Sequence, residues 1–395
     1  MKRREFLIRT AGTVGAMGMG AFPSILRAEP STKLRVGYLP ITDATPLLMA
    51  HALGYFQEEG LNVERPIRVR SWSTLMESFL SGKFNVTHML LPIPIWMRFK
   101  NRVPVKVLAW NHTNGSALTV RGDSNIHSFA DLGGHQIAIP NWYSIHNIIL
   151  QMGLRKFGLK PVIQPQSVKL KPNEVSLFVL SPPEMPAALT GRKIDGYIVA
   201  EPFNAISEIK TGARIMRFTG DIWKNHPCCV VVMHERYTTQ NPIFTQKVIN
   251  AIVRAQLWVT SHPHQTAHIL SREGKNYLPI PKKILLRAFT GYDLAQYGKK
   301  QTSHAIHHPE WNIGRIGFQP WPYPSASRMI IREMQQTLME GDANFLNRLN
   351  IESAAMDLVD DRFVRQAIIA LGGQQLFQGP GGGSGTWERE EIIEI

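Results

Sequence analysis

From residue 34 onward, short apolar runs alternate with longer segments in which apolar residues recur at helical spacing. The runs that predict strands span residues 34–39, 63–69, 84–91 and 105–110. The segments that predict helices span residues 45–59, which end at Gly60, and residues 71–80, which begin at a Ser71 cap and end before Gly82. This alternation predicts a mainly parallel sheet with helices on both of its faces.

The same alternation begins again near residue 117. Strands are predicted at residues 117–120, 136–139, 175–180 and 195–199, and helices at 129–132, 145–157 and 186–189. A buried strand at 229–233 then precedes a nearly all-helical stretch that runs from 241 to 287. We therefore predict an α/β protein of two doubly wound lobes with a ligand cleft between them. Lobe 1 comprises residues 29–116 and 230–377, and lobe 2, residues 117–229, is inserted in it.

The two ends of the chain have a different composition from the two lobes. Arg3 and Arg4 precede Phe6, Leu7 and a weakly apolar, glycine-rich run, which is typical of a twin-arginine export signal over residues 1–28. A disordered basic tail is the alternative. Export would make the protein periplasmic, and without a cysteine at this boundary we expect no lipid anchor. Residues 378–395 contain the run GGGSG and are predicted to be a flexible tail.

The chain is basic, with a formal net charge of +14, of which residues 1–28 contribute +4 and the remainder +10. A positive surface favours anionic ligands or partners. The charges are scattered and no nucleic-acid-binding motif occurs, so we expect no nucleic-acid partner. No apolar run beyond the signal is long enough to span a membrane.

Few residues suggest covalent or metal chemistry. Cys228 and Cys229 are the only cysteines, so a disulfide framework is excluded and two buried free thiols are expected. His226 stands nearby, but neighbouring side chains in a strand point to opposite faces, so we expect no metal site there. No nucleophile elbow, phosphate-binding loop, dinucleotide fingerprint or zinc-protease motif occurs. We therefore expect neither an enzyme nor a cofactor.

Ligands of α/β sheets bind beyond the carboxyl ends of the strands, so the turns after the predicted strands supply the candidate site. In lobe 1 the candidates are Thr42, Asp43, Ser71, Trp72, His88, Asn114, Gly115 and Ser116. In lobe 2 they are His146, Glu184 and Glu201. The alternatives are a core position for Trp72 and His88, and a capping or core position for His146. A helix N-terminus beside His146 favours a bound anion and lowers the pKa of the imidazole.

Several motifs occur in order between residues 34 and 240. They are VGYLPITDATPL at 36–47, GYF at 54–56, EGL at 59–61, SW at 71–72, HMLLPIP at 88–94, IHN at 145–147, PPEM at 182–185, EPFN at 201–204 and DIWKNHP at 221–227. Together they resemble the nitrate- and bicarbonate-binding proteins of ABC importers, and weaker similarity extends to residue 340. The resemblance implies the type II periplasmic-binding-protein fold and a small ligand that is passed to an inner-membrane permease.

The same resemblance implies that Trp72, the turn Asn114–Ser116 and His146 line the ligand site. A family lysine aligns with Cys229 here, with Lys224 nearby, and a family glutamine near Ser116 is absent. These departures leave the choice among nitrate, nitrite, bicarbonate, cyanate and sulfonates open. We therefore predict a monomeric solute-binding protein for a small anion. The alternatives are a periplasmic sensing module for a membrane receptor and a binder of a pyrimidine thiamine precursor.

Overall fold

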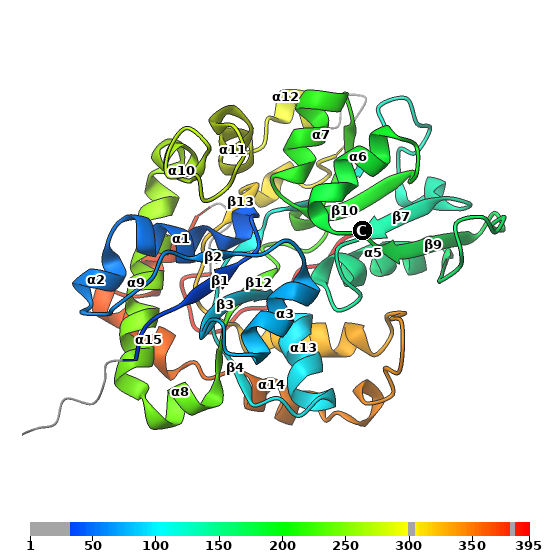
Figure 1. Ribbon diagram of the computed structural model, residues 1–395. Coiled ribbons are helices and arrows are strands. Elements are labelled where there is room, and N and C mark those ends of the chain that lie inside the picture. Colours follow the sequence, from blue (N-terminus) through cyan, green and yellow to red (C-terminus); the bar gives the residue numbers. More distant parts are fainter. Residues whose placement is uncertain (1–31, 299–304, 380–383) are drawn as a thin grey trace, which may run out of the picture. The chain divides into compact units, whose positions relative to one another are not determined.

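Four strands from the first part of the chain and one from far along it form a mixed sheet. The structure, a computed structural model, describes residues 32–298, 305–379 and 384–395 (Figure 1). The strand order is β2-β1-β3-β12-β4. These strands are β1 (Val36–Tyr38), β2 (Ile67–Arg68), β3 (Val86–Leu90), β4 (Val105–Trp110) and β12 (Cys229–His234). β1 is parallel to β2 and β3, whereas β12 is antiparallel to β3 and β4. The predicted strand at 229–233 thus returns the chain to the first sheet.

The second sheet has the order β11-β6-β10-β7-β9-β8. Its strands are β6 (Ser116–Val120), β7 (Gln136–Ile139), β8 (Lys160–Val162), β9 (Glu174–Val179), β10 (Gly196–Ala200) and β11 (Arg214–Phe218). β6 is antiparallel to β10 and β11, and the remaining pairs are parallel. The two mixed sheets with their helices confirm the predicted α/β class, while the lobe boundaries stay a prediction.

Helices of the predicted kind pack on both sheets. Those around the first sheet are α1 (Thr45–Ala52), α2 (Tyr55–Glu58), α3 (Trp72–Leu80), α4 (Pro92–Ile95), α8 (Glu235–Gln240), α9 (Pro242–Ser261), α14 (Ile351–Leu358) and α15 (Arg362–Leu371). Those on the second sheet are α5 (Ile145–Lys156), α6 (Met185–Thr190) and α7 (Phe203–Thr211). The remaining helices are α10 (Pro263–Leu270), α11 (Lys282–Phe289), α12 (Leu294–Tyr297) and α13 (Pro324–Met334).

Two predicted elements are shorter or broken in the structure. The single helix predicted over 45–59 is two helices, α1 and α2, because Gly54 adopts a left-handed conformation with φ of 81° between them. The strand predicted over 63–69 keeps only β2 and an isolated bridge from Val63 to Leu34. The Ser71 cap is confirmed, since its hydroxyl accepts the Thr74 N–H at 3.2 Å.

Two segments connect the sheets, and they lie side by side. Residues 111–115 lead from β4 to β6, and residues 219–228 lead from β11 to β12. An antiparallel bridge joins Thr113 to Pro227, and the Asn114 N–H donates to the His226 oxygen at 3.0 Å. The first segment also contains β5 (Thr113–Asn114), which pairs with β13 (Ile316–Gly317). We call residues 111–115 and 219–228 the crossing segments.

The two ends of the chain differ in what the structure describes. The predicted export signal, residues 1–28, lies outside the described residues. At the other end the structure differs from the expected flexible tail, because residues 384–395 pack against the protein. Ile393 forms a bridge with Trp223, whose indole N–H donates to Glu391 at 2.7 Å, and Trp387 packs on Trp321. This acidic segment contains apolar side chains, and their burial favours packing against the protein. The prediction of a flexible tail was based on the glycine-rich run that precedes them.

Within the described part of the chain, no helix combines the length and the apolar character that crossing a lipid bilayer requires.

Candidate ligand-binding site

The turn after β1 touches the turn after β10, so strands of both sheets end at one junction. Thr42 lies in the short helix Thr42–Ala44, which follows β1, and Glu201 directly follows β10. The Thr42 N–H and the Thr42 hydroxyl both donate to the main-chain oxygen of Glu201, each at 3.0 Å. The carboxyl ends of strands are where α/β sheets place their ligands. The junction is therefore the candidate site.

Trp72 and His88 form the first sheet's side of this junction. Trp72 is the first residue of α3, and its ring meets the His88 ring edge to face with centroids 5.6 Å apart. His88 Nε2 accepts the Leu39 N–H at 3.1 Å, so the neutral ring carries its proton on Nδ1. Burial lowers the pKa of His88 to about 4. The imidazole is therefore neutral at physiological pH and presents an N–H donor.

His146 belongs to the second sheet's side. Ser144 caps α5 by accepting the Asn147 N–H at 3.0 Å, which places His146 in the first helical turn, as predicted. His146 Nε2 lies 2.8 Å from the Ser116 hydroxyl at the start of β6. Burial lowers the pKa of His146 to about 4. The sequence predicted a lowered pKa from the helix dipole, and in the structure burial is the main cause.

Four buried nitrogen atoms in this part of the protein have no hydrogen-bond partner among the described residues. They are Trp72 Nε1, His88 Nδ1, His146 Nδ1 and, on the imidazole beside Asp43, His112 Nδ1. Trp72 Nε1 and His88 Nδ1 carry protons, and His146 Nδ1 does so when the Ser116 hydroxyl donates to Nε2. A buried donor without a partner costs about 1–3 kcal/mol, so native proteins rarely leave one empty. Residues of both sheets thus carry buried donors that have no partner among the described residues.

Asp43 lies within electrostatic reach of both histidines. Burial lowers the pKa of His88 and of His146, and the carboxylate of Asp43 opposes that effect at each ring. Its own carboxylate is fully buried, and Oδ1 has no partner in the described residues. The two rings and the carboxylate therefore share one buried environment.

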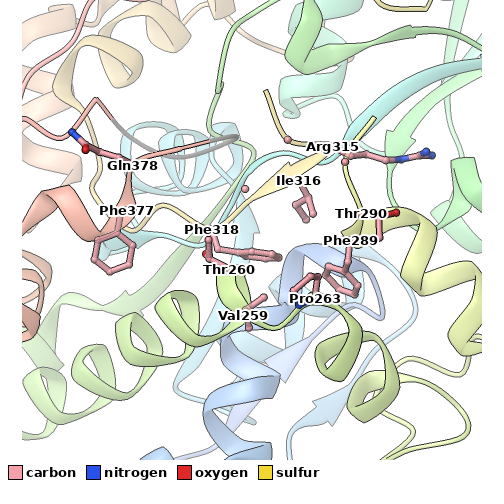
Figure 2. A pocket seen from close by; sticks show the side chains of 13 residues that line it. Val259, Thr260, Pro263, Phe289, Thr290, Arg315, Ile316, Phe318, Phe377 and Gln378 are labelled. Atoms are coloured by element: carbon pink, nitrogen blue, oxygen red, sulfur yellow. The ribbon is translucent and has the colours of Figure 1, made fainter. Parts of the chain in front are cut away.

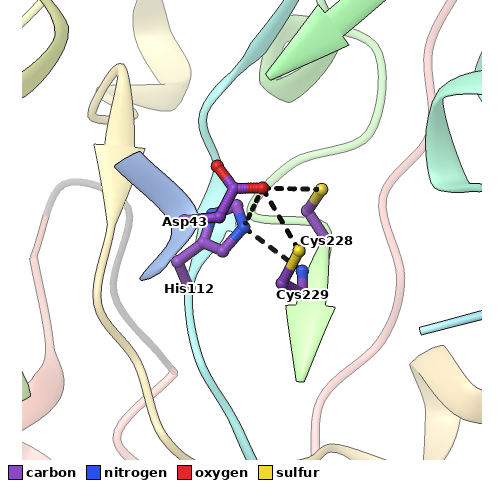
Figure 3. Close-up of side chains that lie close together, drawn as sticks. All are labelled: Asp43, His112, Cys228 and Cys229. Atoms are coloured by element: carbon purple, nitrogen blue, oxygen red, sulfur yellow. Dashed lines mark hydrogen bonds and ion pairs between the residues drawn. The ribbon is translucent and has the colours of Figure 1, made fainter. Parts of the chain in front are cut away.

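The other oxygen of Asp43 is surrounded by three further side chains (Figure 3). Oδ2 lies 3.0 Å from His112 Nε2, 3.2 Å from Cys229 Sγ and 3.7 Å from Cys228 Sγ. All four residues are fully buried. Burial alone would raise the pKa of Asp43, but the adjacent His112 outweighs it and the pKa is lowered. Burial alone would lower the pKa of His112, but Asp43 outweighs it and raises that pKa to about 10.

Two contacts of His112 Nε2 exclude each other in any single protonation state. The Cys229 N–H donates to Nε2 at 3.2 Å, and Asp43 Oδ2 faces the same nitrogen at 3.0 Å. An imidazolium donates to Asp43 but cannot accept from Cys229, whereas a neutral ring that accepts from Cys229 leaves two acceptor atoms facing each other. A proton or a cation is therefore required between Nε2 and Oδ2.

The prediction that the two thiols point in opposite directions is wrong. β12 begins at Cys229, so Cys228 lies outside the pleat and the alternation of a strand does not apply to the pair. Both sulfur atoms reach Asp43 instead (Figure 3). The prediction of two buried free thiols is confirmed. His226, which the sequence placed beside them, bonds to Thr219 Oγ1 at 2.8 Å, and His112 takes the position next to the sulfur atoms.

Three predicted site residues take no part in these contacts. The Ser71 hydroxyl accepts the Thr74 N–H as a helix cap. Glu184 is exposed at the start of α6. Lys224 Nζ stands over the Trp311 ring, 6.0 Å from its centroid. Their side chains serve helix capping and the surface rather than the junction.

Three further predicted residues have structural partners of their own. The Glu201 carboxylate accepts from Arg315 Nε at 2.8 Å, and both side chains are buried. Asn114 and Gly115 are left-handed, with φ of 55° and 80°, and turn the first crossing segment toward β6. The Asn114 amide donates to the Gly314 oxygen at 3.1 Å. Arg315 was not predicted, since it lies more than a hundred residues beyond Glu201.

His112 is the residue that sequence reasoning missed at the site. It lies in the same turn as the predicted Asn114, Gly115 and Ser116, so a signal was present. Asn111 in this turn also reaches the site, because its amide donates to the main-chain oxygen of Asp43. The histidine was passed over because nothing in the sequence indicates that Asp43 approaches it.

A separate cavity of about 300 Å³ lies beside β13 (Figure 2). Its lining is mainly apolar and includes Val259, Phe289 and Phe318. Arg315 contributes to the lining but turns its guanidinium away from these side chains, toward Glu201. This lining includes no predicted site residue, so the cavity is distinct from the junction.

Known proteins of similar sequence support the expected fold. The chain is 29% identical over 248 residues to the nitrate/nitrite binding protein NrtA of Nostoc sp., covering 58% of this chain and 54% of that protein. It is 22% identical over 330 residues to the NrtA protein of Synechocystis sp., covering 78% of this chain and 70% of that one. The chain thus spans about half the length of the Nostoc relative.

Solved structures have the same architecture. The periplasmic nitrate-binding protein NrtA from Synechocystis superposes with a TM-score of 0.71 at 18% identity, covering 89% of this chain and 92% of that one. The alkanesulfonate-binding protein SsuA from Xanthomonas axonopodis, bound to MOPS, gives 0.59 at 15% identity, covering 86% and 98%. Residues 27–271, more than half of the sequence, match the NMT1-like family. The chain therefore belongs to the NMT1-like family and has the periplasmic-binding-protein fold that its sequence predicts.

Proposed function

We propose that this protein is the solute-binding component of an ABC importer and that it captures a small anionic nutrient between its two lobes. The observation that carries this proposal is the set of buried, unpaired nitrogen atoms of Trp72, His88 and His146. Hydrogen bonds from N–H groups to a charged acceptor are shorter and stronger than neutral ones. The oxygen atoms of nitrate, nitrite, bicarbonate, cyanate or a sulfonate are acceptors of this kind.

The ligands named for similar proteins support the same class. They are nitrate or nitrite for the NrtA proteins, and MOPS, itself a sulfonate, for the solved alkanesulfonate-binding protein. The resemblance aligns Cys229 with a family lysine, and this difference would change the charge at the site. The ligand is therefore a small anion of this group, and which one is a matter for direct measurement.

The crossing segments are suited to act as the hinge. Residues 111–115 and 219–228 both lead from one sheet to the other. The unpaired nitrogen atoms are buried, so a ligand enters only when the sheets move apart, as in hinge-bending binding proteins. After closure, a permease in the inner membrane would receive the ligand from the closed protein.

Export places the protein where such a ligand is captured. The pair Arg3 and Arg4 is typical of a signal read by the twin-arginine pathway, which would deliver the protein to the periplasm. Replacing both by lysine, Arg3→Lys with Arg4→Lys, is expected to leave the protein in the cytoplasm. Cell fractionation measures this, and normal periplasmic accumulation of the double variant would refute the export route.

A ligand panel followed by calorimetry tests the binding function. The protein is screened by thermal shift with nitrate, nitrite, bicarbonate, cyanate, methanesulfonate and a thiamine-precursor pyrimidine. A ligand at 100 times its Kd stabilises the native state by about 2.7 kcal/mol. The anion that binds is then titrated into Trp72→Phe and His146→Gln, each of which removes one ring donor and retains most of the side-chain volume.

We expect each variant to lose about ten- to a hundredfold in affinity, the effect of removing one hydrogen bond to a charged ligand. Trp96→Phe is the matched control, because Trp96 packs on Tyr143 and supplies no donor to the junction. Binding of the pyrimidine with no response to any anion would overturn the proposed ligand class. Unchanged anion affinity in both variants would overturn the assigned site.

A further inference from the structure

Four buried side chains of metal-binding type converge beside the junction. Asp43 follows β1, and His112 lies in the first crossing segment. Cys228 is the last residue of the second crossing segment, and Cys229 is the first residue of β12 (Figure 3). One ligand atom from each, a carboxylate oxygen, an imidazole nitrogen and two sulfur atoms, lies within 4.8 Å of every other. These residues come from three separate parts of the sequence, so the fold, and not a local motif, brings them together.

The spacing of these atoms is close to that of the ligands in a tetrahedral metal centre. With bonds of about 2.3 Å to sulfur and about 2.0–2.2 Å to nitrogen and oxygen, the ligands of a tetrahedral zinc ion lie about 3.3–3.8 Å apart. Asp43 Oδ2 lies 3.0 Å from His112 Nε2, 3.2 Å from Cys229 Sγ and 3.7 Å from Cys228 Sγ. Small movements of these side chains would accommodate an ion at their centre.

We propose that Asp43, His112, Cys228 and Cys229 bind one zinc-type divalent ion through the carboxylate, imidazole Nε2 and two thiolates. Thiolates select soft or borderline metals and exclude magnesium and calcium, and the carboxylate favours a divalent ion over copper(I). Four protein ligands leave no open coordination position, which is typical of a structural zinc site. Binding releases the two thiol protons and the proton on His112 Nε2 to solvent, and the ion then takes the place of that proton between Nε2 and Oδ2.

The position of this site gives the ion a specific effect. His112 belongs to the crossing segment 111–115, and the two cysteines lie where residues 219–228 meet β12. An ion held by them and by Asp43 joins both crossing segments to the turn after β1. All four ligands are fully buried, so the ion enters during folding and exchanges slowly. The site goes beyond the proposed anion binding and does not depend on it.

Metal analysis of the ligand-free, full-length protein tests this proposal. The protein is expressed with zinc, purified without a metal-affinity step, and its metal content is measured by elemental mass spectrometry. We expect one zinc ion per chain. In chains refolded with Co²⁺ we expect thiolate-to-cobalt absorption in the near ultraviolet and the intense visible bands of tetrahedral cobalt.

The variants Cys228→Ser, Cys229→Ser and His112→Gln are expected to reduce metal occupancy by at least about tenfold. His226→Gln is the matched control, since His226 is a buried histidine in the same crossing segment and is not among the four ligands. It is expected to retain the ion and the cobalt spectrum. Circular dichroism measures whether each variant is folded. Where a variant does not fold, the cobalt spectrum of the wild-type protein decides the proposal.

Wild-type protein that contains no zinc and yields no tetrahedral cobalt spectrum would overturn the proposal. So would a Cys228–Cys229 disulfide found by mass spectrometry in the purified protein, or metal occupancy that is equal in the cysteine variants and the wild type. None of these measurements involves an anion. A negative result in the anion panel therefore does not affect the metal-site proposal. A negative metal analysis likewise does not affect the importer proposal, which the anion panel tests.

Discussion

The main-chain oxygen of Glu201 accepts two hydrogen bonds from Thr42, one from the N–H and one from the hydroxyl, each at 3.0 Å. Thr42 follows a strand of the first sheet, and Glu201 follows a strand of the second. The two bonds therefore form only when the carboxyl ends of both sheets meet. If the sheets separate to admit a ligand, the protein loses both bonds and regains them on closure.

Thr42→Val tests this contact, because it removes the hydroxyl, keeps the shape of the side chain and leaves the N–H bond in place. A neutral hydrogen bond contributes about 0.5–1.5 kcal/mol, so ligand affinity is expected to fall about two- to tenfold. Titration calorimetry with the ligand from the panel measures the change. Thr45→Val is the control, since the Thr45 hydroxyl donates to the Thr42 oxygen within one turn. Equal losses in both variants would contradict a closure-specific role.

Trp72 is both a core residue and a donor, and two substitutions separate these roles. Its side chain is only 3% exposed, and its indole nitrogen is unpaired. Trp72→Ala is expected to cost about 3–5 kcal/mol of stability because it leaves a cavity. Trp72→Phe fills most of that volume and is expected to cost clearly less stability while still losing ligand affinity. Urea unfolding and calorimetry on both variants measure this, and equal stability losses would show that volume does not govern the effect.

Local patterns account for most of the fold that the sequence predicts. The Ser71 cap and the strands 105–110 and 136–139 depend on neighbours along the chain, and the structure has them at the predicted places. The break at Gly54 was missed because the apolar spacing continues through it. The spacing of apolar residues alone does not indicate a left-handed residue, because the helical pattern can continue on both sides of it.

The site was predicted only in part because its contacts join distant residues. His146 and Trp72 were predicted from their helix starts, a local signal. The meeting of Asp43 with His112 and with the two cysteines spans separations of 69 and of more than 180 residues. Such a meeting follows from the order of strands in the first sheet, where β12 inserts between β3 and β4. No periodicity in the sequence encodes that insertion.

The buried pair of Glu201 and Arg315 makes a stability prediction. Glu201→Gln removes one charge and leaves the Arg315 guanidinium, 3% exposed, with Glu208 at 3.2 Å as its remaining carboxylate. Breaking a buried ion pair costs about 3–5 kcal/mol, and Glu208 places this variant near the lower end. Urea unfolding measures it. The control is Glu184→Gln, an exposed site expected to stay within about 0.5 kcal/mol of the wild type.

The pH dependence of stability depends on His88 and His146, the two ring donors. Each has a pKa of about 4 in the folded protein, against 6.5 as the reference value. His88 is surrounded by Leu39, Trp72, Asp43 and His112. His146 is surrounded by Ser116, Asp43 and the histidines at 112 and 226. In both environments burial outweighs the carboxylate, so the native state keeps both rings neutral.

As pH falls from 6.5 toward 4, the unfolded chain therefore binds protons that these two native rings do not, and stability falls with pH. Each histidine contributes up to about 3 kcal/mol over this window. In the metal-free protein His112, whose pKa is raised to about 10, stays protonated across this window and adds little to the slope. Urea unfolding at several pH values measures the effect. His146→Gln is expected to flatten the curve between pH 6.5 and 4, and a slope equal to that of the wild type would contradict a neutral, buried His146.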